Sequence, residues 1–148
     1  LGKRVAQLEE LQRLLLILQG EIRCVRLTLP AVCELLAKDA KAPFQQFFWK
    51  VSEDLGKRTG QTAGEIWSRN LKEIQKLLFL TKKEQQDLEE FGQLLGRMDM
   101  PMQLSAIQFY QEKIMLSLAE AKAAADSRQK LYRYLGALGG AALVLVIM

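Results

Sequence analysis

Residues that commonly carry catalysis are scarce in this sequence of 148 residues. Histidine is absent, which excludes Ser-His-Asp and Cys-His catalysis, histidine-ligated metals and a histidine switch near neutral pH. Cys24 and Cys33 lie nine residues apart and form no CxxC pair. A thiolate zinc site or thioredoxin-type redox chemistry is therefore not expected.

One short sequence resembles a phosphate-binding loop, namely Gly56-Lys57. That motif requires a glycine five positions before Gly56 and a Ser or Thr after the lysine, where this chain has Val51 and Arg58. A hydrolase built on two carboxylates would need a distinctive acidic pair, and none stands out from the surface acids. The sequence predicts a protein that is not an enzyme and that has no cofactor, metal or small-molecule substrate.

Charge excludes a further class of function. The chain carries 21 basic and 17 acidic residues, a net charge of +4, and the two signs alternate along most of its length. A nucleic-acid groove would need a basic stripe with stacking aromatic side chains. Alternating signs are instead typical of solvated helix faces, so no nucleic-acid partner is expected.

The composition predicts the elements that position the remaining residues. Leu occurs 27 times, whereas the β-branched residues Val, Ile and Thr together number only 17, a balance that favours helices over strands. We predict an all-α fold in which helices pack as one six-helix bundle. Breaks at Pro30, Pro43, Gly56, Thr81 and Asp99 place the helices near residues 3–27, 30–39, 43–57, 62–78, 82–96 and 100–147.

The first and last helices are predicted to lie against each other. Each carries apolar or small residues at alternating spacings of three and four, which is a heptad seam. The first seam comprises Leu8, Leu11, Leu15, Leu18, Ile22 and Val25, and the last helix carries Leu104, Ile107, Gln111, Ile114, Leu118, Ala121 and Ala125. The fourth helix is predicted to bury Ile66, Trp67, Leu71, Ile74, Leu77 and Leu78.

Four acidic residues, Glu84, Asp87, Glu89 and Glu90, gather early in the fifth helix. Acids at a helix N-terminus are favoured by the helix dipole, which accounts for their placement. A partner-binding acidic surface is the alternative interpretation.

The carboxyl terminus is the most informative segment, because residues 134–148 contain no charged residue. A helix that is apolar on every side does not suit the surface of a soluble bundle. From Leu131 the segment measures about 27 Å as a helix, close to the 30 Å of a bilayer core. We expect a transmembrane helix continuous with the last bundle helix, with Gly136 and Gly140 forming a face for helix packing. The alternative is a buried central helix of a larger soluble assembly.

Basic residues predict the topology. Arg128, Lys130 and Arg133 precede the apolar segment, and Lys3 and Arg4 lie at the amino end. The positive-inside rule then places residues 1–133 in the cytoplasm as a helical bundle domain and residues 134–148 in the membrane. Both cysteines are accordingly expected to be reduced.

Short segments spread over the whole chain resemble the stage III sporulation protein AB family of endospore-forming bacteria. The matching positions include Glu21, Ile22, Thr28, Pro30, Gly92, Leu95, Gly96, Asp99 and Gln103, together with the segments 80–84 and 130–136. Each segment alone is weak, but their order and spacing are specific. Family members usually carry an aromatic residue near position 24 or 25, where this chain has Cys24 and Val25. They also have an N-terminal membrane helix, which would end where this sequence begins.

The resemblance implies a helical domain like the cytoplasmic domains of the inner-membrane platform protein of type II secretion and type IV pilus machines. It implies a membrane-anchored, non-catalytic assembly component of the channel complex that joins mother cell and forespore. Its expected place is the cell membrane on the mother-cell side, coupled to a cytoplasmic secretion-type ATPase. The alternative is a tail-anchored adaptor or regulator that binds a cytosolic partner protein.

Overall fold

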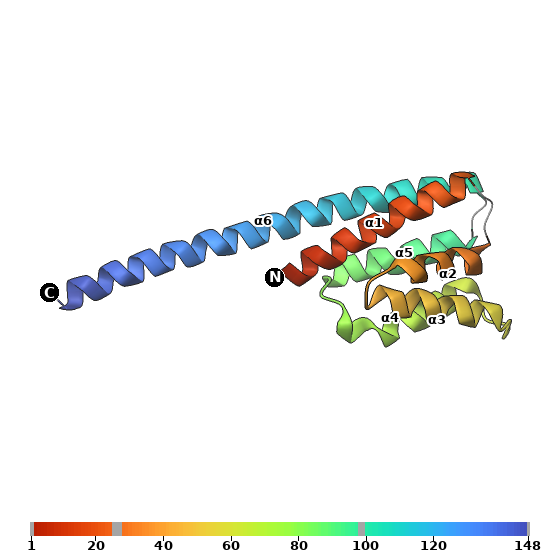
Figure 1. Cartoon of the computed structure of the whole chain (residues 1–148), viewed down its shortest axis with the longest axis horizontal. Coiled ribbons are helices and arrows are strands. Elements are labelled where there is room, and N and C mark those ends of the chain that lie inside the picture. Colours follow the sequence, from red (N-terminus) through yellow and green to blue (C-terminus); the bar gives the residue numbers. More distant parts are fainter. Residues whose placement is uncertain (1, 25–27, 98–99, 148) are drawn as a thin grey trace.

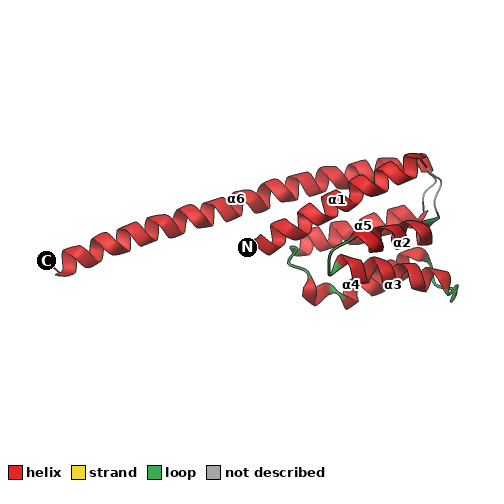
Figure 2. Cartoon of the chain, viewed as in Figure 1, coloured by secondary structure: helices red, strands yellow, loops and turns green. Residues whose placement is uncertain are grey.

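The computed structural model describes residues 2–24, 28–97 and 100–147, and within this part of the chain every element is a helix (Figure 2). The elements are α1 (Gly2–Cys24), α2 (Leu29–Asp39), α3 (Phe44–Gly56), α4 (Ala63–Glu73), the short 3₁₀ helix η1 (Gln75–Leu77), α5 (Lys82–Arg97) and α6 (Met100–Ile147). The predicted all-α fold with six helices is confirmed.

Successive helices reverse direction, so that neighbours pack side by side. α6 lies along α1 and also contacts α5, while α2 to α5 form the other side of the bundle (Figure 1). The second half of α6 projects beyond the bundle. The N-terminus of α1 and the turn after α4 lie at the end of the bundle from which α6 projects.

Threonine side chains begin three of the helices. The hydroxyl oxygens of Thr28 and Thr62 accept hydrogen bonds from the backbone N–H groups three residues later. Thr81 and Glu84 form a complete capping box, because each side chain accepts a hydrogen bond from the backbone N–H of the other. Each cap satisfies donors that the first turn of a helix leaves without an internal partner.

An aromatic cluster built around Trp67 of α4 joins four helices in the core. The Trp67 ring packs edge-on against Phe47 and Phe48 of α3 and against Phe91 of α5. Phe91 in turn stacks on Tyr110 of α6, with ring centroids 4.7 Å apart. The indole N–H of Trp67 donates to the Leu88 carbonyl at 3.1 Å, so its polar atom is satisfied although the residue is buried. Phe47 and Phe48 of α3 are therefore core residues.

The two seams meet as predicted. Leu8, Leu11, Leu15, Leu18 and Ile22 of α1 are buried, as are Ile107, Ile114, Leu118 and Ala121 of α6. The side chain of Gln111 donates to that of Gln19 across the pair at 3.4 Å. Val25 lies outside the described residues.

The prediction of one helix over residues 62–78 is wrong for its last five residues. α4 ends at Glu73, η1 follows, and Leu78 adopts an extended conformation. Leu78 and Leu80 are buried by this route, whereas Leu77, which the sequence predicted to be buried, is 50% exposed. The physical reason is tertiary, since the backbone on both sides of Leu78 binds a side chain of α1 that local sequence does not reveal.

Candidate functional site

Groups suited to catalysis or metal binding do not gather in the described part of the chain. No three Asp, Glu or Cys residues there are placed to share a metal ion. Cys33 is a free thiol, fully buried, and burial raises its pKa to about 12, which makes the reactive thiolate scarce. The Cys24 side chain lies outside the described residues. One set of polar groups joins α1 to the rest of the bundle, at the end from which α6 projects.

The first of these contacts is made by the buried side chain of Gln7. Its Nε2 donates to the Leu77 carbonyl at 3.0 Å, and its Oε1 accepts from the Phe79 N–H at 2.7 Å. The single side-chain amide of Gln7 therefore hydrogen-bonds backbone groups on both sides of Leu78. The turn is held so that Leu77 and Phe79 both face outward, half exposed.

Arg4 makes the second contact, with Glu84 at the start of α5. The Nε–H of its guanidinium donates to Oε1 of Glu84 at 3.1 Å, and an Nη2–H donates to Oε2 at 2.6 Å. Burial opposes the ionised form of Glu84, but Arg4 and the Thr81 N–H outweigh it, so the pKa of this carboxyl lies below its usual value. The pair fixes the first turn of α1 to the capping box of α5.

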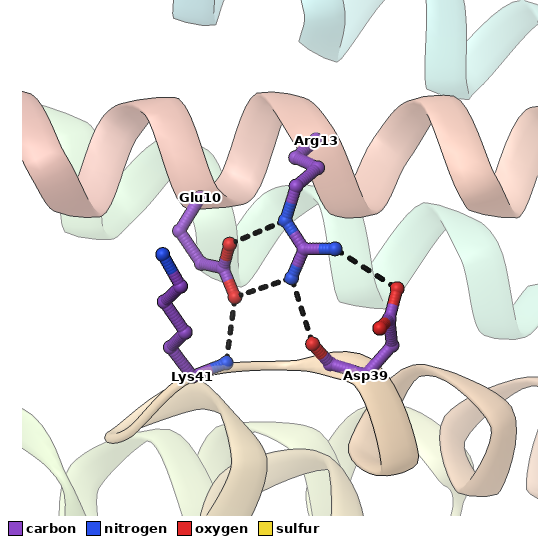
Figure 3. A network of polar contacts seen from close by, with 4 residues as sticks. All are labelled: Glu10, Arg13, Asp39 and Lys41. Carbon is purple, nitrogen blue, oxygen red and sulfur yellow. Dashed lines mark hydrogen bonds and ion pairs between the residues drawn. The ribbon is translucent and has the colours of Figure 1, made fainter.

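A third contact joins α1 to the loop between α2 and α3 (Figure 3). Glu10 is buried and accepts two bonds from Arg13, at 2.7 and 2.8 Å, and one from the Lys41 N–H at 2.6 Å. Arg13 also donates to the carboxylate and the backbone carbonyl of Asp39. The bonds from Arg13 hold the pKa of Glu10 below its usual value despite its burial. Arg13 thus closes the carboxyl end of α2.

These contacts make the first half of α1 a rigid support for two loops. The sequence carries one weak sign of these contacts, because Gln7 and Glu10 are polar residues on the buried, otherwise apolar side of α1. Their partners lie about 30 to 70 positions away along the chain, so no periodicity identifies them. The arrangement can position surfaces, but it presents no nucleophile beside a base.

The four acidic residues of α5 do not share one exposed surface. Glu84 is only 4% exposed and is paired with Arg4, so it is too deep to contact a partner directly. Asp87 and Glu90 both face Lys113 of α6, at 3.4 and 3.5 Å. Glu89 accepts a hydrogen bond from Ser68 of α4. The partners found in the structure belong to the bundle itself.

Two of the positions that carry the family resemblance, Gly92 and Gly96, are glycines of α5 that pack closely against α4. A Cβ placed on Gly92 would overlap the indole ring of Trp67, so only glycine fits beneath that ring. A Cβ on Gly96 would lie 3.0 Å from the Cβ of Ala63, which is tighter than ordinary contact. These glycines let α4 and α5 approach closely around the aromatic cluster.

The other family-like positions lie at helix ends and junctions. Thr28 caps α2, the Pro30 carbonyl accepts from the Ser52 hydroxyl, and Gln103 donates to the Leu95 carbonyl, tying α6 to α5. Leu95 and Ile22 are buried, and Glu21 lies next to Ile22 on α1. Asp99 lies outside the described residues. The roles of these positions in the structure are architectural.

The α6 backbone continues without a break to Ile147, so the apolar segment belongs to the same 48-residue helix as the buried seam. Within the part of the chain whose side chains are described, no helix combines the length and apolarity needed to cross a bilayer. The side chains from 134 onward, including the positions of Gly136 and Gly140, lie outside that part.

Comparison with known proteins gives one consistent result. The sequence model of the family described as stage III sporulation protein AB matches residues 1–148. Stage III sporulation protein AB of Bacillus subtilis (strain 168) is 30% identical over 146 residues, covering 99% of this chain and 85% of the relative. A solved structure of a stage III sporulation protein AB superposes with a TM-score of 0.75 at 28% identity, covering 84% of this chain and 97% of that one.

Proposed function

The chain belongs to the stage III sporulation protein AB family, and from this we propose that it is a membrane-anchored, non-catalytic assembly component of the channel complex joining mother cell and forespore. The observation that carries the proposal is the continuity of α6. One helix contributes buried seam residues to the bundle as far as Ala121 and runs on through the charge-free segment to Ile147.

The composition of the carboxyl-terminal segment supports insertion into a bilayer. Its seven Leu, Val and Ile residues favour insertion by roughly 3 kcal/mol in total on a translocon scale, which is modest for a single span. A segment with so modest a preference for the bilayer is stabilised there by packing against a neighbouring helix. Gly136 and Gly140 provide the small residues that close helix packing needs. Lys130 and Arg133 precede the segment and are exposed, which supports a bundle domain in the mother-cell cytoplasm.

A continuous α6 also suits coupling to a cytoplasmic secretion-type ATPase. Any displacement of the bundle is transmitted along an unbroken helix into the membrane, and α1 is locked to two loops by Gln7 and Arg13. The absence of histidine and the high pKa of Cys33 support a role without covalent chemistry.

Replacing Gly136 and Gly140 with leucine tests this proposal in an endospore-forming host that lacks its own copy. We expect G136L/G140L to reduce heat-resistant spore formation and co-purification of the channel complex, while the bundle stays folded. The matched control is A137L/A141L, which places two leucines at the same spacing on another face of the helix. A G136L/G140L strain that sporulates normally and retains its complex would contradict the packing role.

A further inference from the structure

We propose that the turn after α4 is a docking surface for an acidic segment of another protein. The surface, called here the basic tip, comprises the exposed apolar pair Leu77 and Phe79 and five exposed lysines around it, Lys3, Lys72, Lys76, Lys82 and Lys83. The proposal extends the platform role by assigning a surface to one of its protein contacts.

The first observation is that the apolar pair is presented rigidly. Leu77 and Phe79 are 50% and 51% exposed, in a turn whose backbone is bound on both sides by the buried amide of Gln7. The ammonium of Lys3 lies 4.9 Å from the centroid of the Phe79 ring, which it orients without covering. A side chain fixed before binding loses less entropy when a partner covers it.

The second observation is the concentration of charge. The five lysines of the tip are accompanied by one exposed acid in the same stretch, Glu73, since Glu84 is buried against Arg4. The tip therefore has a net charge of +4, equal to the net charge of the whole chain, and the remaining residues balance one another. Such a local excess attracts an acidic partner and raises its rate of association.

The third observation is the shape of the surface. A groove of about 370 Å³ runs between α4 and α5, with Lys72 and Lys82 among its lining residues and Leu71 in its floor. The other lining residues are Ser68, the glutamines at positions 75, 85 and 86, and Glu89, whose carboxylate accepts a hydrogen bond from the Ser68 hydroxyl. Amides and lysines along a groove beside exposed apolar side chains suit a peptide segment that carries carboxylates and an apolar anchor.

The shape of the surface favours a protein over an anionic lipid surface. Charge alone would attract the tip to lipid headgroups, whereas a groove beside two half-exposed apolar side chains, Leu77 and Phe79, fits a peptide segment. The proposal rests on the assembly function proposed above, and a lipid surface is the alternative occupant that the experiment distinguishes.

Photo-crosslinking from position 79 tests the proposal in the full chain. The benzophenone amino acid p-benzoylphenylalanine replaces Phe79 in sporulating cells, and the crosslinked peptide is identified by mass spectrometry. We expect one protein, crosslinked through a segment rich in Asp and Glu. In a K72E/K82E background the crosslink should weaken about tenfold or more, because like charges then face each other. The matched control K38E/K50E reverses two exposed lysines elsewhere and should leave it unchanged.

Three results would overturn the proposal: a crosslink to phospholipid, a crosslink that K72E/K82E leaves intact, or no crosslink from a protein that is folded and membrane-bound. Fractionation of the same cells keeps the two proposals separate. Loss of the protein from the membrane fraction contradicts the anchored platform, whereas a membrane-bound protein with no acidic protein partner at position 79 contradicts only the basic tip.

Discussion

The side-chain amide of Gln7 accepts a hydrogen bond from the backbone N–H of Phe79, 72 positions further along the chain. With its donation to the Leu77 carbonyl, this bond replaces the helical pairing that α4 would otherwise have continued. The contact determines both where α4 ends and which side chains the following turn exposes.

Substitution of Gln7 by leucine should release that turn. Leucine is close to glutamine in size but cannot form hydrogen bonds, so the Leu77 carbonyl and the Phe79 N–H lose their partner. The free energy of unfolding should therefore fall by about 1–3 kcal/mol. Hydrogen exchange at the Phe79 amide should accelerate far more than exchange at α3. Unchanged protection at position 79 would show that the clamp is dispensable.

Two glycine substitutions should have opposite effects on stability. G92A places a methyl group where the Trp67 indole lies and should destabilise the fold by about 1–3 kcal/mol. G20A meets nothing within 4 Å at an exposed position inside α1 and should stabilise it by about 1 kcal/mol. Urea unfolding of the full chain in mild detergent measures both. A neutral G92A would refute the close packing of α5 beneath Trp67.

Removal of the Glu10 carboxylate should loosen the loop between α2 and α3. E10A takes away the acceptor of the Lys41 N–H and of two Arg13 bonds, and we expect a cost of about 1–3 kcal/mol. A double-mutant cycle with R13A should give a coupling energy clearly different from zero, because the two side chains act as one unit. Additive effects would mean that the network in Figure 3 stabilises nothing as a network.

Stability should be greatest between about pH 5 and 8.5 and fall on both sides. Arg13 and Arg4 lower the pKa values of Glu10 and Glu84, so the stability that these carboxylates contribute is present above their ordinary pKa values and is lost as the pH falls below about 4.5. Burial raises the pKa of the Cys33 thiol to about 12, so its contribution is complete below about pH 9 and is lost as the pH rises towards 12.

Burial also raises the pKa of Tyr110, which adds to the alkaline loss. The variant Y110F keeps the ring and removes the titrating hydroxyl, so its free energy of unfolding should decline less steeply above pH 10 than that of the unchanged chain. Equal slopes would show that Tyr110 remains protonated to the same extent when the chain unfolds.

Much of the architecture follows from local rules that sequence displays. The heptad seams predicted the pairing of α1 with α6, and the break at Thr81 predicted the start of α5. The end of α4, the outward orientation of Leu77 and the burial of Glu84 were not predictable in this way. Each depends on a polar contact from Arg4 or Gln7 across the bundle, and such contacts leave no periodic trace in either partner's sequence.

We propose that residues 134–148 anchor this domain in a membrane complex that sporulation requires. The heat-resistant spore count of a host whose copy ends at Arg133 tests this anchoring, with accumulation of the folded bundle verified in the same cells. We expect a count as low as that of a host without the gene. A count equal to that obtained with the unaltered chain would contradict it.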